Sequence, residues 1–198
     1  MKKFEEKKFN VPALKGISAR NIEEHLKLYS GYVKHANLIL EKIEEMAKDS
    51  EKNAYALGEL QRRFGFEWGG MRNHEYYFAH FEGGSQAVDP KSALAADITA
   101  EWGSFEGWLA RFKAVALTRG VGWAMLYYDN KTGRLVNAWI DEQHLGQLVD
   151  ACPILCLDMW EHSFVADYQP SGKKQYVEDF FANLNWKSVE KNLADAGR

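Results

Sequence analysis

Cysteine is scarce in this chain of 198 residues, which holds only Cys152 and Cys156. The two lie four positions apart in a segment expected to be a strand. This spacing separates their Cα atoms by roughly 13 Å at ~3.3 Å per residue. A disulfide needs Cα atoms within about 7 Å of each other. We therefore expect two free thiols, which suit a reducing, cytoplasmic environment.

The chain also lacks a large charge of one sign and long apolar runs. Its formal net charge is only -3, so electrostatics favour neither a nucleic-acid partner nor a membrane partner, although a small anion could still be attracted locally. No apolar run approaches the roughly 18 residues of a transmembrane helix. The opening stretch MKKFEEKKF is charged and does not resemble a secretory signal.

Several common catalytic signatures are missing as well. The sequence contains no G-x-S-x-G nucleophile motif, no phosphate-binding G-x-x-x-x-G-K-[ST] loop and no G-x-G-x-x-G dinucleotide fingerprint. Serine-triad, nucleotide and dinucleotide chemistry therefore find no support in the sequence.

The first part of the chain is typical of a helical hairpin. Apolar and aromatic residues recur at helical spacing over residues 18–48, with Ser18 as the expected N-cap. A second helix is predicted over residues 53–81. Glycines at positions 65, 69 and 70 are expected to interrupt it and to allow backbone or ligand to approach closely. Two such segments predict an antiparallel pair.

A turn-rich stretch, EGGSQAVDPKS, indicates a domain boundary near residue 85. We expect a helical hairpin domain over residues 1–85 and an α/β domain over residues 86–198. The second domain is predicted to contain helices at 91–101 and 104–118, a hairpin of strands at 122–129 and 134–141, a third strand at 152–158 and a helical region at 172–193. The predicted fold class is α+β, with a three-stranded antiparallel sheet flanked by helices.

Ionisable residues on these elements suggest a metal site. A lone histidine on an apolar stripe is usually a packed core residue. Here His25 lies on the inner face of the first helix and His74 in the middle of the second, and facing helices often direct metal ligands inward. Asp158 ends an apolar strand and His162 follows it. Three imidazoles and a carboxylate suit iron, manganese or zinc.

The same residues leave a second metal chemistry open. Two histidines and one carboxylate with free coordination positions are typical of non-haem iron oxygenases. A fourth ligand and the aromatic residues around the site argue against that interpretation.

The segment LDMWEHSFVADY closely resembles the D-x-W-E-H-[AS]-[FY] signature of the iron/manganese superoxide dismutases. Other segments resemble this family along most of the chain: FNVPALKGISARNIEEH, RNHEYYF, GSFEGWLARFKAVALTRGVGWAMLYYD and YVEDFFANLNWKSVEKNL. The resemblance implies that the protein converts superoxide to O2 and H2O2 with one Fe or Mn ion per subunit, cycling between M(III) and M(II).

The resemblance also assigns residues to roles. The metal ligands would be His25, His74, Asp158 and His162. Glu161 would reach the partner subunit's His162 in a homodimer or homotetramer. An apolar wall around the metal would come from Phe78, Trp123 and Trp160.

The sequence departs from the family at the outer positions of the site. The family usually has a histidine four residues after the first ligand and a gateway tyrosine eight after it. Tyr29 and Val33 occupy these positions here. We expect Tyr32 to be the gateway residue instead, because positions four and seven after His25 both return to its face of the helix. Val165 stands where many members have a tyrosine that pairs with the missing histidine.

Two residues are candidates for the group that holds the metal-bound solvent. Gly70 occupies the position where iron-type members often place a glutamine, which directs attention to the loop DEQHLGQL. His144 is the first candidate there and Gln143 the second. Cys156, two residues before Asp158, is a candidate for tuning metal preference. If the altered outer residues disable the chemistry, the alternative is a catalytically silent metal-binding protein.

Overall fold

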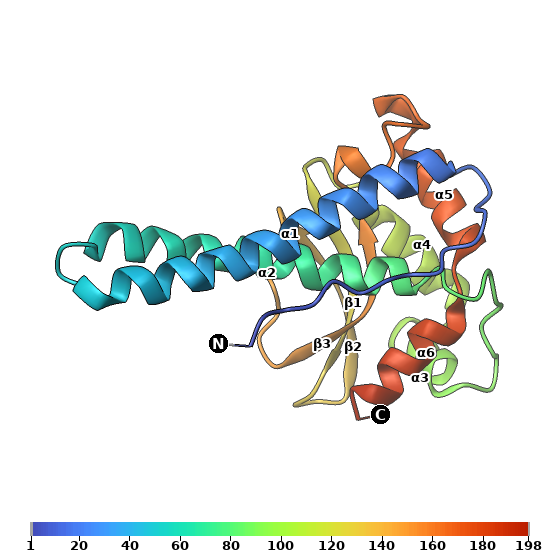
Figure 1. Cartoon of the computed structure of the whole chain (residues 1–198). Coiled ribbons are helices and arrows are strands. Elements are labelled where there is room, and N and C mark those ends of the chain that lie inside the picture. Colours follow the sequence, from blue (N-terminus) through green and yellow to red (C-terminus); the bar gives the residue numbers. More distant parts are fainter. Residues whose placement is uncertain (1, 198) are drawn as a thin grey trace.

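The computed structural model describes residues 2–197 and places a long helical hairpin beside a small sheet covered by further helices (Figure 1). The helices are α1 (Ala19–Met46), α2 (Ala54–Ala79), α3 (Ala93–Trp102), α4 (Phe105–Ala116), α5 (Lys173–Asn183) and α6 (Trp186–Asp195). The strands are β1 (Gly122–Asp129), β2 (Arg134–Asp141) and β3 (Ala151–Asp158). Short 3-10 helices occupy Ala47–Asp49 (η1), Glu161–Ser163 (η2) and Pro170–Gly172 (η3). The predicted α+β fold class is confirmed.

Helix α1 begins where the sequence indicates. The Ser18 side chain accepts a hydrogen bond from the backbone N–H of Asn21, which satisfies one of the free donors of the first turn. The buried face of α1 includes His25, Tyr29 and Val33 and continues to Ile39. This face packs against α2, so the predicted hairpin is confirmed.

Helix α2 differs from the prediction at its glycines. It runs unbroken from Ala54 to Ala79, so the expected interruption at Gly65, Gly69 and Gly70 is wrong. Isolated glycines weaken a helix by roughly 1 kcal/mol each, and packing against α1 and the sheet compensates for that loss. The close approach that these glycines were expected to allow is present and is described below.

The sheet has the strand order β2-β1-β3 and is antiparallel throughout. In this register, Trp123 of β1 lies opposite Ile140 of β2 on one side and Asp158 of β3 on the other. The two strands of the first hairpin turn through Gly133, whose φ of 69° favours glycine. The register places Asp158 at the end of the sheet nearest Trp123.

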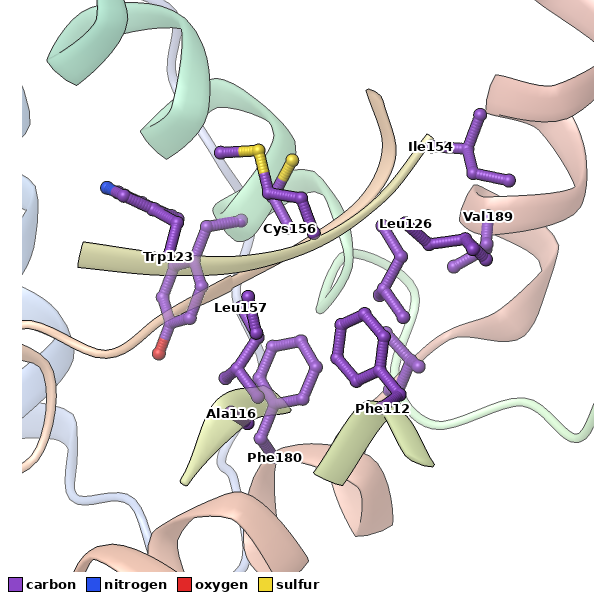
Figure 2. Packing of buried hydrophobic residues seen from close by; sticks show 14 of the residues in the cluster. Phe112, Ala116, Trp123, Leu126, Ile154, Cys156, Leu157, Phe180 and Val189 are labelled. Carbon is purple, nitrogen blue, oxygen red and sulfur yellow. The ribbon is translucent and has the colours of Figure 1, made fainter. Parts of the chain in front are cut away.

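The two faces of the sheet pack against different parts of the chain. Side chains alternate along each strand, and Figure 2 shows Trp123 and Cys156 on one side of it. On the other side, Leu157 lies with apolar residues of α4 and α5 that include Phe112 and Phe180. These side chains are fully buried. Both faces are thus part of the hydrophobic core, and the face that carries Trp123 and Cys156 also carries Asp158.

The outer edge of β3 is closed by side chains. The Cys156 N–H donates to Nε2 of His80 at 3.2 Å, and Asn192 donates to the carbonyl of Ile154 at 3.0 Å. The opposite ring nitrogen of His80 lies 2.8 Å from the hydroxyl of Ser188. These contacts fix the strand that ends in Asp158.

The segment around the expected domain boundary near residue 85 connects α2 to α3 and is bound to the C-terminal helices. Gln86 donates its N–H to Leu184 and accepts one from Trp186. The division at residue 85 stays a prediction. Both cysteines are free. No helix within residues 2–197 has the length and apolarity needed to cross a membrane.

Candidate metal centre

The four predicted ligands meet at one point. His25 comes from α1, His74 from α2, Asp158 from the end of β3 and His162 from η2. One ligand atom from each residue lies within 4.8 Å of all the others. His25, His74 and Asp158 are completely buried, and the side chain of His162 is 21% exposed. The sequence-predicted cluster is thus assembled from segments as far apart as residues 25 and 162.

The donor atoms converge on a single carboxylate oxygen. Oδ2 of Asp158 lies 3.1 Å from Nε2 of His25, 3.5 Å from Nε2 of His74 and 3.2 Å from Nε2 of His162. Such separations match those of ligands that share one ion at bond lengths of about 2.0–2.2 Å. The other oxygen of Asp158 accepts the N–H of Trp160 at 2.8 Å, which leaves Oδ2 aimed at the histidines.

His74 shows most clearly that the cluster fits a cation. Its Nδ1 lies 2.6 Å from the carbonyl oxygen of Gly70, so Nδ1 carries the proton and Nε2 presents a lone pair. That Nε2 is buried and has no hydrogen-bond partner among residues 2–197. A buried acceptor without a donor is costly, and a metal ion removes that cost.

The protonation states also suit a metal. Burial lowers the pKa of His25 and brings that of His74 to about 3, so both imidazoles are neutral at neutral pH. Burial alone raises the pKa of the Asp158 carboxyl, but His162 and the hydrogen bonds at the site reverse this and lower it. Neutral imidazoles with an ionised carboxylate are the forms that bind metal.

Aromatic rings lie around the cluster. The centroid of Phe78 lies 5.0 Å from that of His25, and Trp123 lies 5.1 Å from His74. Trp160 stacks on His162 at 5.6 Å. The three side chains assigned to an apolar wall therefore each contact a different histidine.

Tyr32 and Gln143 are joined beside the cluster. The Gln143 amide donates to the Tyr32 hydroxyl oxygen at 3.0 Å, and its carbonyl oxygen accepts from Nε1 of Trp123 at 2.9 Å. Gln143 is completely buried. The Tyr32 ring lies 5.1 Å from that of His74. Val33, the other candidate position for the gateway residue, is buried in the core. Tyr32 is the one of the two that contacts a ligand histidine.

Helix α2 lets these groups approach because its residues 69 and 70 are glycines, which have no side chain. A Cβ at Gly70 would lie 2.4 Å from Cδ1 of Tyr32, and a Cβ at Gly69 would lie 2.1 Å from the carbonyl oxygen of Gln143. His144, the first sequence candidate for the solvent-holding group, packs against Gly65 and Phe66. The structure thus brings Gln143 to Tyr32 and turns His144 toward the outer side of α2.

Two supporting contacts were not assigned from sequence. Asn73 is buried and donates to the backbone carbonyl of Gln143 at 3.0 Å, so it holds the loop that carries that residue. Tyr176 donates to the carbonyl of Asp158 at 2.9 Å. The position of Asn73 directly before His74 could have indicated a role for Asn73 at the site. The contact of Tyr176 joins α5 to the end of β3, and no sequence pattern indicates that these two elements meet.

The remaining predicted residues lie further out. Tyr29 is buried, but its hydroxyl contacts Lys7 and Glu75 instead of the cluster. Cys156 is fully buried and burial strongly raises its pKa, so it is a neutral thiol. Glu161 is exposed, and its carboxylate forms no hydrogen bond or ion pair within residues 2–197.

Three imidazoles and one carboxylate, held between a helical hairpin and a three-stranded sheet, define a protein with a mononuclear transition-metal centre. The family described as iron/manganese superoxide dismutases, C-terminal domain, matches residues 90–192. A superoxide dismutase [Mn] of Mycobacterium avium is 35% identical over 175 residues, covering 87% of this chain and 82% of that protein. A superoxide dismutase [Fe] of Cupriavidus metallidurans is 35% identical over 189 residues, covering 93% and 92%. The chain therefore belongs to the iron/manganese superoxide dismutase family.

Proposed function

We propose that the chain dismutates superoxide at the His25–His74–Asp158–His162 cluster, with one Fe or Mn ion per subunit. The observation that carries this proposal is the convergence of three histidine nitrogens on one oxygen of Asp158. Two superoxide anions and two protons give O2 and H2O2. Fe or Mn held by these four residues would supply the one-electron chemistry, because either ion can alternate between M(III) and M(II).

The side chains beside the cluster would position the solvent molecule and provide a hydroxyl proton. Burial keeps the pKa of Tyr32 well above its usual value, so its hydroxyl stays protonated and can donate toward the site. The Gln143 amide points at that hydroxyl, and Trp123 holds the amide's other end. We infer that Gln143, not His144, orients the solvent molecule at the metal and that Tyr32 is the gateway residue. This intact chain of contacts favours catalysis over a silent metal-binding role.

The outer side of the site supports a proposed assembly. Glu161 is exposed in the single chain, and Nδ1 of His162 makes no hydrogen bond within residues 2–197. We propose that Glu161 binds the partner subunit's His162 in a homodimer, which a homotetramer would preserve. A carboxylate there would fix the tautomer of the ligand histidine. Val165 is 45% exposed beside this surface.

A cytoplasmic location is part of the same proposal. The two cysteines are free, and unpaired thiols persist in a reducing compartment.

Reconstitution tests the proposed activity. Metal-free protein would be loaded separately with iron and with manganese, and superoxide consumption and H2O2 formation would be measured against bound metal. Activity with at least one metal is the expected result and identifies the working cofactor. Full occupancy by each metal without activity would overturn the proposal and favour a metal-binding protein.

A further inference from the structure

The segment of residues 4–10, here called the strap, runs lengthwise along the hairpin and contacts both of its helices (Figure 1). It belongs to no helix or strand. Its backbone is held by side chains from the hairpin and from the residues that follow α2. Asn37 bonds both the N–H and the carbonyl of Phe4, at 2.8 and 2.9 Å. The Lys7 N–H donates to the Tyr29 hydroxyl and the Asn10 N–H donates to Glu82, each at 2.9 Å.

The centre of this attachment is a nearly buried carboxylate. Glu75 is 7% exposed and directly follows the ligand His74 in sequence. It accepts from the Tyr29 hydroxyl at 3.3 Å and from Arg72 at 2.8 Å, and it pairs with the Lys7 ammonium at 2.9 Å. A buried charge needs such partners, so the strap's own Lys7 helps to stabilise it.

Tyr29 uses its hydroxyl in both directions. It accepts the Lys7 N–H from the strap and donates to Glu75 on α2. Its pKa is raised to about 12, chiefly by burial, so the donated proton stays in place. Tyr29 therefore connects the strap to both helices of the hairpin, one helical turn after His25.

The strap also contributes an aromatic layer behind the metal ligands. The Phe9 ring lies 5.6 Å from that of Tyr29 and 5.5 Å from that of Phe78. Phe78 in turn contacts His25 at 5.0 Å. Displacement of the strap would leave Phe78 without its outer neighbour, and the wall beside His25 would loosen.

We propose that Tyr29, together with Glu75, is a positioning residue that locks the strap onto the hairpin and so holds Phe78 and His25 in place for metal retention. This rests on the proposed metal centre but not on turnover. A tyrosine at position 29, where the family usually has a histidine, therefore has its own contacts. Its hydroxyl bonds Lys7 of the strap and Glu75 of α2.

The test uses manganese-loaded protein with the Tyr29→Phe substitution, which removes the hydroxyl and keeps the ring. Two quantities are measured: amide hydrogen exchange in residues 4–10, and the rate of manganese release to a chelator. We expect strap exchange to rise about tenfold, since Glu75 and the Lys7 N–H lose a partner. Manganese release should accelerate, but by less than the roughly 10–100-fold effect of losing a residue that bonds a metal ligand directly.

Two further variants separate positioning from general destabilisation. Tyr168→Phe removes a hydroxyl that bonds Gly16 and Asp179, away from Glu75, and should leave strap exchange and metal release unchanged. Phe9→Ala keeps the Tyr29 hydroxyl but removes the layer behind Phe78, and should also accelerate metal release.

Unchanged strap exchange in Tyr29→Phe would overturn the lock. A freed strap with wild-type metal release in both Tyr29→Phe and Phe9→Ala would overturn the positioning role. Neither readout involves superoxide. A metal-replete but inactive wild-type protein would therefore overturn the proposed function alone.

Discussion

The ring of Tyr32 packs directly onto the backbone of Gly70, so closely that a Cβ at position 70 would lie 2.4 Å from Cδ1 of the ring. Real Cβ contacts are essentially never that short. The glycine therefore reserves the space in which the tyrosine hydroxyl meets the amide of Gln143. Helix composition and site geometry are linked at this one position.

Gly70→Ala should displace Tyr32 and break its hydrogen bond to Gln143. Overpacking of this kind costs about 1–3 kcal/mol of unfolding free energy. We expect that loss in denaturant unfolding, together with reduced superoxide consumption per bound metal. Metal content should stay close to wild type, because the four ligands are untouched.

Gly58→Ala is the matched control in the same helix. A Cβ there would meet nothing within 4 Å, and alanine is favoured over glycine in a helix by up to about 1 kcal/mol. This variant should be slightly more stable with unchanged activity. Equal effects of the two substitutions would show that Tyr32 does not need the space at Gly70.

Gln143→Ala should lower turnover at constant metal content. The side chain is buried between Tyr32 and Trp123, and loss of such an outer contact typically costs about 10–100-fold. His144→Ala should stay within about threefold of wild type, since this side chain packs on the outer side of α2. The measurement is superoxide consumption normalised to bound metal. A larger loss in His144→Ala would reverse the assignment.

Glu161→Ala should weaken subunit association. Within residues 2–197 the exposed carboxylate forms no hydrogen bond or close ion pair, although its charge acts on Lys173. We propose that it binds the partner subunit's His162. Sedimentation at decreasing protein concentration should show dissociation at a concentration at least about tenfold higher than for wild type. Unchanged association and metal content would remove Glu161 from the interface.

The buried, neutral His80 should make the free energy of unfolding depend on pH. Burial lowers its pKa to about 3, against about 6.5 in the unfolded chain. Between these values the unfolded state binds a proton that the folded state does not, so stability falls as pH falls from about 6.5 toward 3. The contribution of His80 should therefore make the free energy of unfolding about 2 kcal/mol lower at pH 5 than at pH 7.

Comparison of metal-free wild type with His80→Gln isolates that contribution. The variant cannot take up the proton, so its unfolding free energy should change less between pH 7 and pH 5. Parallel pH profiles for the two proteins would mean that His80 is not kept neutral by the fold.

Much of this site was predictable because its ligands lie in regular elements. His25 and His74 occupy inward faces of amphipathic helices, and Asp158 ends a buried strand. Tyr32 could be chosen over Val33 from helical geometry and the family's pattern together. These inferences depend on spacing along one element, which sequence records directly.

The choice between Gln143 and His144 was not predictable in the same way. Their loop begins at Glu142, whose φ is 52°, so neither helical nor strand periodicity applies to it. Nor did the sequence indicate that Tyr29 meets Lys7 and Glu75, 22 and 46 residues away. Only tertiary packing determines such contacts.

The most direct test of the central claim is a metal titration of a single preparation. Increasing amounts of the active metal are added to metal-free protein, and superoxide consumption is recorded with bound metal. The account predicts that activity rises linearly and stops at one ion per chain, and that His162→Ala neither retains the ion nor gains activity. Full activity in His162→Ala, or a plateau that does not coincide with one ion per chain, would contradict it.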